Sequence, residues 1–375
     1  MSWDEIRAKY PDKFVRITPA KIRNSFQFSV SLHAFRIFLS KKFGSMKKRL
    51  YLCAQHTHPA SRKNSALRVS VFLLPKNMTQ STYSKTFLSH QAQIALLKSR
   101  RMSIADESKA LHLLENISYY RFSGYWYPLL SDKQNHVFKP GATFETAFNL
   151  YKFDSELRRL ILSELGKIEI AVRSKMVYVL STAHNVFWIE DTALFANPSV
   201  HLSTLSKIEE ELDRSDEEFI VAFKSKYVNR FPPSFILLEI TSFGALSRLY
   251  SNMKPGKPKK DIAKMFGLPD RVFASWLHSL VYIRNVCAHH ARIWNRPMSI
   301  QPLFPRNASN AWITNRQTGI NRVFYALSMI LYLLNMVNPN HSFKQKLESL
   351  FCKYPNVDRA AMGFPAGWRT EPLWR

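Results

Sequence analysis

The sequence predicts an all-α fold, and three observations support that prediction. Apolar residues recur at three- and four-residue spacing over most of the chain after residue 89. The alternation of apolar and polar residues that is typical of half-buried strands is rare. The 375 residues include only 10 glycines, so a glycine-rich nucleotide-binding fold is not favoured. We therefore expect the orderly part of the chain to be built of helices.

The expected helices follow one another from residue 89 to residue 351. Ser89 opens the first, over 89–97, and the second covers 106–117. A long helical region follows in two pieces, 143–151 and 154–180, with Asp154 as the expected N-cap of the second piece. Pro232-Pro233 interrupts the chain, and 254–260 is expected to be a basic loop. The remaining expected helices cover 202–212, 217–226, 234–250, 261–266, 269–287, 323–337 and 341–351.

Closely spaced aromatic residues lie between the second helix and the long helical region, in the stretch 117–129. Aromatic residues at this density usually form a core or a packing platform. Stacking on nucleic-acid bases is the alternative.

Residues 1–77 read differently from the rest of the chain. They hold 16 of the 54 basic residues and 3 of the 27 acidic ones, and no helical period persists in them. Two interpretations compete: a basic arm that binds nucleic acid, or an upstream extension with Met78 close to the natural start. Conflicting local signals favour the extension. Residues 78–375 are then the helical domain.

The net charge of +27 predicts an anionic partner, which is either nucleic acid or an anionic membrane surface. A merely solvated basic surface is the simpler reading. The most apolar stretch, Val323 to Val337, is shorter than the roughly 20 residues that span a bilayer, so we expect no membrane partner. Three dispersed cysteines and an N-terminus unlike a signal peptide predict a cytoplasmic location.

The strongest candidate site is the run Arg284-Asn285-Val286-Cys287-Ala288-His289-His290, which ends an otherwise apolar helix. RNA cleavage without a metal needs one group to deprotonate the attacking 2′-hydroxyl and another to protonate the leaving 5′-oxygen. Histidine suits both roles because its pKa lies near operating pH. An arginine can hold the charge that develops on the phosphate oxygens, and an amide can orient either group.

Helical geometry limits how one copy of this run can act. On an ideal helix Asn285 and His289 share a face, whereas Arg284 and His289 lie about 140° apart. They can meet if the arginine curls round, if the helix is distorted, or if two copies face each other. The last arrangement would double the histidines and arginines around one phosphate, which favours a homodimer.

Other chemistries fit the run less well. His289 and His290 could simply be cations at a helix C-terminus. A metal nuclease needs clustered carboxylates and a zinc site needs paired ligands, and neither is present near the run. Cys287 is interpreted as a packing residue, and no glycine-rich phosphate loop exists. We expect neither a cofactor nor a metal.

The run and the residues after it, Ala291-Arg292-Ile293-Trp294-Asn295-Arg296, resemble the signature of the Abi-like family, the abortive-infection proteins of AbiD/AbiF type. These belong to the HEPN superfamily of helical ribonuclease domains, which carry an Arg-polar-X3-His motif. Three further blocks are similar to that family, and together the resemblance covers about residues 80–375. They are the stretches 116–126, 169–174 and 362–365, the last with Trp368 and Trp374.

The resemblance implies a HEPN-type helical bundle with additional helices. It also implies a toxic, metal-independent, dimeric endoribonuclease of phage defence that leaves 2′,3′-cyclic phosphate ends. Arg284, Asn285 and His289 carry over as the catalytic residues. The expected supporting residues are His290, Arg292, Arg296, Glu169 and Arg173. The rival hypothesis is a non-catalytic protein that binds a cognate small RNA. A third is that the motif or the nearby Tyr282 is modified to silence the protein.

Overall fold

The structure is a computed structural model that describes residues 82, 84, 86–316 and 318–375, together with the backbone of three short strands before them. The chain divides into two compact units, Met1–Phe87 and Leu88–Arg375. The expected boundary after residue 77 lies outside the described residues, so the division at that point stays a prediction.

The first unit contains a small antiparallel sheet that the sequence did not predict. Its strands are β1 (Phe14–Val15), β2 (Tyr51–Ala54) and β3 (Val69–Phe72), in the order β1-β3-β2. In the register Phe72 of β3 lies opposite both Phe14 and Tyr51.

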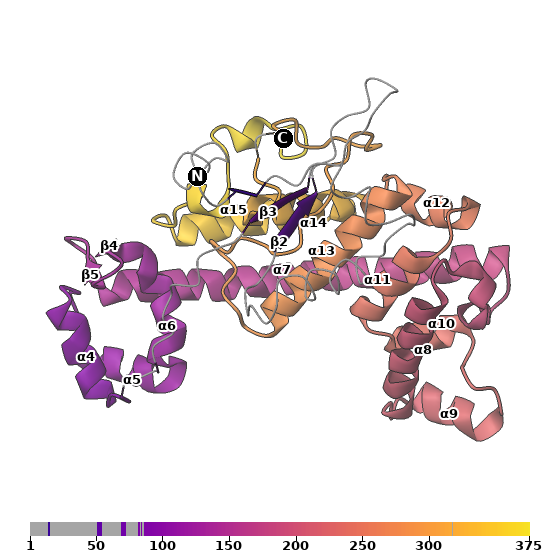
Figure 1. Cartoon of the computed structure of the whole chain (residues 1–375), viewed down its shortest axis with the longest axis horizontal. Helices are drawn as coiled ribbons and strands as arrows, with labels where there is room; N and C mark the ends of the chain where they lie inside the picture. Colours follow the sequence, from indigo (N-terminus) through magenta and orange to yellow (C-terminus); the bar gives the residue numbers. More distant parts are fainter. Residues whose placement is uncertain are drawn as a thin grey trace. The chain divides into compact units, whose positions relative to one another are not determined.

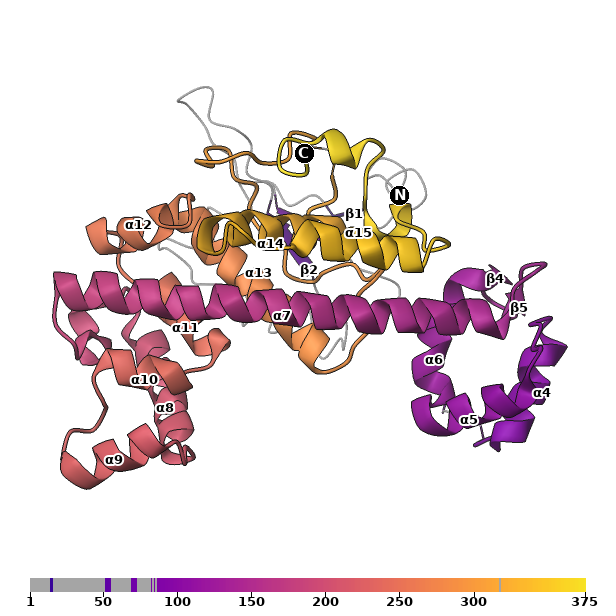
Figure 2. The same cartoon turned by 180° about the vertical axis from the view of Figure 1, so that it is seen from behind.

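The second unit is helical, as predicted, and is built on one long helix. This helix, α7 (Phe144–Ala183), has 40 residues and runs without interruption (Figures 1 and 2). At 1.5 Å per residue it is about 60 Å long. Its buried side chains recur every three or four residues, and they pack against α13 (Asp270–Ala288), α14 (Val323–Val337) and α15 (Phe343–Lys353).

The segment before α7 forms a second hydrophobic core with the start of that helix. Phe122, Trp126 and Phe144 lie at its centre, with aromatic rings about 5 to 6 Å apart between centroids. The aromatic-rich stretch is thus mainly a packing platform. The elements around this core are α4 (His90–Ser99), α5 (Glu107–Ile117), α6 (Tyr119–Trp126) and the hairpin of β4 (Leu130–Asp132) and β5 (Val137–Phe138).

Five helices lie between α7 and α13 in the sequence, and three of them, α10, α11 and α12, contact α7 directly. Helix α11 packs along α13, and the ring of Tyr250 meets Phe273 edge-on at 4.9 Å. This packing fixes the position of α13, which carries the candidate site. The five are α8 (Pro198–Asp213), α9 (Glu218–Lys226), α10 (Ser234–Ile240), α11 (Phe243–Asn252) and α12 (Lys257–Lys264).

Helix α14 is the most buried helix of the core, and its bounds agree with the sequence prediction. Every residue from Val323 to Leu334 is buried. Its Ser328 hydroxyl accepts a hydrogen bond from the indole of Trp374, at 3.0 Å, which ties the C-terminal segment to the core. In the part of the chain that the structure describes, no helix has the length and apolar character to cross a membrane.

Four local expectations differ from the structure. Helix α7 does not restart at Asp154. The expected helix 234–250 is broken at Thr241, where Ser242 caps α11 by accepting a hydrogen bond from the Ala245 amide. Helix α12 begins inside the expected basic loop, because Pro258 suits the first turn of a helix. Helix α6 was not expected at all.

Candidate functional site

The predicted catalytic residues lie at the C-terminal end of α13. Arg284 is half-buried in the last turns, whereas Asn285 and the C-cap residue His289 are exposed. The Arg284 guanidinium donates a hydrogen bond to the Asn285 amide oxygen at 3.3 Å, and the His289 amide donates to the Asn285 carbonyl at 3.0 Å. The amide of Asn285 thus orients Arg284, and both groups are accessible to a ligand.

A tight turn follows the helix, and His290 is its pivot. His290 has φ of 54°, in the left-handed region that glycine usually occupies. Its amide donates to the Cys287 carbonyl at 3.1 Å, and the Ala291 amide donates to the Val286 carbonyl at 3.0 Å. This pair of bonds is the Schellman motif, which satisfies the last carbonyls of a helix and turns the chain back.

Two arginines fasten helix α6 to this turn. Arg121 of α6 donates to the His290 carbonyl at 2.6 Å. In the other direction Arg292, just after the turn, donates to the carbonyl of Gly124. A side chain at Gly124 would project toward the Arg292 guanidinium, since a Cβ there would lie 3.4 Å from Nη1. Arg292 therefore ties the turn to α6, and its supporting role in the site stays a prediction.

Asp154 anchors the chain after the turn. One oxygen of its fully buried carboxylate accepts the amides of Ile293 and Trp294, at 3.0 and 2.7 Å. The other oxygen accepts the Tyr125 hydroxyl at 2.7 Å and the guanidinium of Arg158. The expectation that Asp154 is an N-cap is wrong, because its carboxylate is used by a segment about 140 residues later in the chain rather than by its own helix.

Cys287 lies inside the candidate run but is completely buried. Burial, together with the negative charge of Asp154, raises the pKa of its thiol to about 12. Since the thiolate is the nucleophilic form, this cysteine is inert near neutral pH. Its interpretation as a packing residue agrees with the structure.

Arg296 and Tyr282 meet on the other side of the motif. The Tyr282 hydroxyl lies 3.4 Å from the hydroxyl of Ser299. Burial acts to raise the pKa of Tyr282, but hydrogen bonds with Ser299 and the nearby Arg296 outweigh it, so the pKa lies below its usual range. Arg296 thus lies near Tyr282, and Tyr282 precedes Arg284 by about half a turn of α13.

Glu169 and Arg173 form an ion pair on α7, at 2.7 Å. Arg173 also donates to the Thr241 carbonyl at 3.0 Å, in the corner between α10 and α11. That corner touches α13, since a Cβ at Gly244 would lie 3.9 Å from Val281. The pair therefore supports the helix that carries Arg284. Arg173 binds this corner and not the motif itself.

The structure brings together the turn residues but does not pair Arg284 with His289. Within the described residues, the Arg284 side chain forms a hydrogen bond with the Asn285 amide oxygen alone. Sequence reasoning missed Arg121 and the anchoring role of Asp154. A signal for Asp154 was available, because Asp154 and Arg158 occupy the same three- and four-residue stripe as the apolar Ile161 and Leu165.

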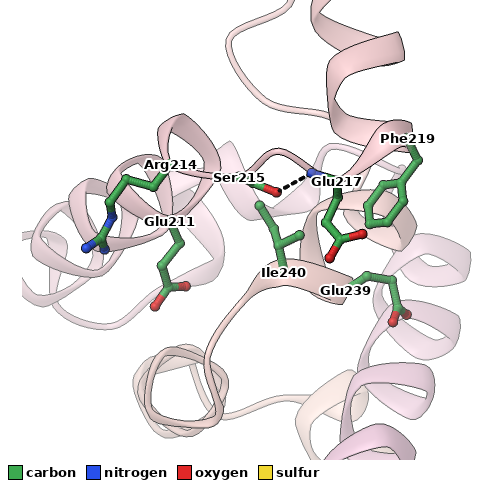
Figure 3. Close-up of a pocket in the computed structure, with 7 residues that line it drawn as sticks. All are labelled: Glu211, Arg214, Ser215, Glu217, Phe219, Glu239 and Ile240. Atoms are coloured by element: carbon green, nitrogen blue, oxygen red, sulfur yellow. Dashed lines mark hydrogen bonds between the residues drawn. The ribbon is translucent and has the colours of Figure 1, made fainter.

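Separate from the motif, a hollow of about 500 Å³ lies between α8, α9 and α10 (Figure 3). Three of its seven lining residues are glutamates, and the Glu217 amide donates to the Ser215 hydroxyl at its rim. Carboxylates repel phosphate groups, so this hollow does not extend the motif as an RNA site. Its lining residues are Glu211, Arg214, Ser215, Glu217, Phe219, Glu239 and Ile240.

Comparison with known proteins identifies one family. Residues 112–295, just under half of the chain, match the family described as Abi-like protein. The matched region begins in α5, includes α6, α7 and α13, and ends one residue after Trp294, so it contains the turn and its anchors. Neither a curated protein nor a solved structure matched the chain. The family match over these residues supports the Abi-like family for this chain.

Proposed function

We propose that the chain is an abortive-infection protein of AbiD/AbiF type within the HEPN superfamily, and that it cleaves RNA without a metal during phage defence. The observation that carries the proposal is the cluster of half-buried Arg284 with exposed Asn285 and His289 at the end of α13. The family match and the net charge of +27 support it.

The proposed reaction is an internal transfer at phosphorus. A neutral His289 removes the proton of the ribose 2′-hydroxyl, and the 2′-oxygen attacks the adjacent phosphorus. The bond from phosphorus to the 5′-oxygen breaks, and that oxygen takes a proton from a protonated histidine. Arg284 holds the negative charge of the phosphate oxygens. The products are a 2′,3′-cyclic phosphate and a 5′-hydroxyl.

The second histidine that this reaction needs is His289 of a second copy. Arg284 is bonded to Asn285 and not to His289 of its own chain, so one copy presents a partial set of groups. A two-fold dimer with facing motifs would place two histidines and two arginines around one phosphate.

The test is RNA cleavage in EDTA by the purified full-length protein. We expect the wild type to cleave, and His289→Ala and Arg284→Ala to lose at least about 100-fold in rate, the lower range for one acid–base group. The matched control is His278→Ala, an exposed histidine on the same helix, which should cleave as the wild type does. Full activity in His289→Ala would exclude the proposed role.

The alternative is a non-catalytic protein that holds a cognate small RNA. The same exposed, cationic helix end favours it, since phosphate binding needs the charge but not the proton transfers. In that case an intact RNA copurifies with the protein, and the two alanine variants change only the affinity for it. Sequencing the copurifying RNA and measuring its integrity distinguish the two functions.

A further inference from the structure

Helix α6 exposes one tyrosine of its aromatic cluster. The ring of Tyr119 packs edge-on against Trp126 at 5.0 Å, and Phe122 does so at 5.2 Å. These contacts turn one face of the helix toward the core. Tyr120 lies on the opposite face, and 90% of it is exposed to solvent.

That exposed face is the one that meets the motif turn. Tyr120 and Gly124 are four residues apart, so they lie one above the other on α6. The Arg292 guanidinium covers Gly124 and donates to its carbonyl. Arg121, next to Tyr120, donates to the carbonyl of His290, the neighbour of His289. Tyr120 therefore lies next to Arg121 and on the same helix face as Gly124, and these are the two residues through which α6 contacts the motif turn.

We propose that Tyr120 is a base-stacking residue that holds an unpaired RNA base beside the Arg284–His289 run. This inference rests on the proposed RNA substrate. A flat ring in water next to cationic groups is the usual arrangement for binding single strands, in which the cations hold the phosphates and the ring stacks on the base. Arg121 and Arg292 each donate a hydrogen bond to a backbone carbonyl. Each guanidinium keeps its positive charge and further N–H donors, which can bind phosphates.

The stacking role also defines the class of substrate. Bases inside an RNA duplex are already stacked on one another, so a protein ring can reach only those in single strands, loops or bulges. The site should therefore prefer unpaired RNA. An exposed tyrosine is by itself ordinary. Tyr178 of α7, which is 67% exposed, is therefore the control residue for the effect of removing an exposed ring.

The experiment measures binding of fluorescein-labelled 2′-O-methyl RNA, which lacks the attacking hydroxyl and stays intact, to the full-length protein by anisotropy. We expect Tyr120→Ala to weaken binding of the single strand about 5- to 150-fold. Tyr120→Phe, which keeps the ring, should bind within about 2-fold of the wild type, as should Tyr178→Ala. Binding of a duplex of the same sequence should be unaffected by Tyr120→Ala.

Three results would overturn the inference. They are unchanged single-strand binding by Tyr120→Ala, an equal loss in Tyr120→Phe, and a change in native mass of Tyr120→Ala that accounts for the loss. The readout is independent of cleavage. A protein that stacks RNA on Tyr120 but does not cut it would contradict only the nuclease, and normal cleavage and binding by Tyr120→Ala would contradict only the stacking site.

Discussion

His290 shows how a single residue can serve the backbone and still belong to a candidate site. Its φ of 54° is costly for a residue with a Cβ, by about 1–2 kcal/mol in the left-handed region. The turn is kept nevertheless, because the His290 carbonyl accepts Arg121 and its amide closes the Schellman motif. The backbone of His290 therefore ends α13 and links the turn to α6.

We expect His290→Gly to raise the free energy of unfolding by about 1 kcal/mol, because glycine adopts the left-handed region without strain. His290→Ala is the control, since it removes the imidazole and keeps the strain, and it should leave stability unchanged. Urea unfolding of the three proteins measures the differences. An equal gain in both variants would show that the side chain, not the backbone, is responsible.

At the scale of elements, the candidate site depends on three helices that are distant in sequence. Helix α13 supplies the motif, α6 holds the turn through Arg121, and α7 anchors the next segment through Asp154. The buried Asp154 carboxylate also neutralises Arg158. Removing its charge leaves Arg158 buried without a counterion.

Asp154→Asn should lower the free energy of unfolding by about 3 kcal/mol, at the lower end for breaking a buried pair because the amide keeps one acceptor oxygen. It should also impair the motif, since Ile293 and Trp294 lose a charged acceptor. Glu156→Gln on the same helix breaks an ion pair with the more exposed Lys353 and should cost less than about 1 kcal/mol. Equal losses in the two variants would refute the anchoring role.

Glu164 links α7 to α15 and predicts a dependence of stability on pH. Burial acts to raise the pKa of Glu164, but bonds from Lys167 at 2.7 Å and Lys346 at 3.2 Å outweigh it, so the folded pKa lies below 4.5. A depressed pKa stabilises the fold above 4.5, and this contribution is lost as pH falls through the folded pKa.

Glu164→Gln should therefore be less stable than the wild type at pH 7, and the difference should shrink as the pH falls below about 4.5. Thermal unfolding of both proteins between neutral and acidic pH measures this. A difference that stays constant over that range would mean that the carboxylate charge does not contribute.

The elements show which parts of the structure the sequence could predict. The bounds of α14 and the end of α13 follow from apolar periodicity and from the polar run at residue 284. Helix α6 and the anchor Asp154 depend on contacts between segments about 140 to 170 residues apart, which local patterns do not contain. The positions of Arg284, Asn285 and His289 on α13 could be predicted, but not the turn that presents them.

At the scale of the whole molecule, the chain consists of two compact units with different compositions. The first, Met1–Phe87, includes the strongly basic stretch 1–77, and the second, Leu88–Arg375, holds all the groups of the candidate site. The family match also lies entirely within the second unit. All residues named for the site and its anchors therefore belong to the second unit.

We expect a chain that begins at Met78 to fold with the same melting temperature for the helical unit and to keep its activity on RNA. Its binding to RNA should lose part of its salt dependence if the basic stretch contacts phosphates. Calorimetry and titrations at several salt concentrations test both statements. Loss of the folding transition on truncation would show that the first unit is needed for stability.

The central claim is that the Arg284–His289 run cuts RNA by attack of the 2′-hydroxyl without a metal. Its most direct measurement is the chemical identity of the ends that the wild type and His289→Ala leave on RNA in EDTA. We predict 2′,3′-cyclic phosphate and 5′-hydroxyl ends from the wild type, and at least about 100-fold slower formation of these products by His289→Ala. Products with 3′-hydroxyl and 5′-phosphate ends, or the same products formed at the same rate by both proteins, would contradict it.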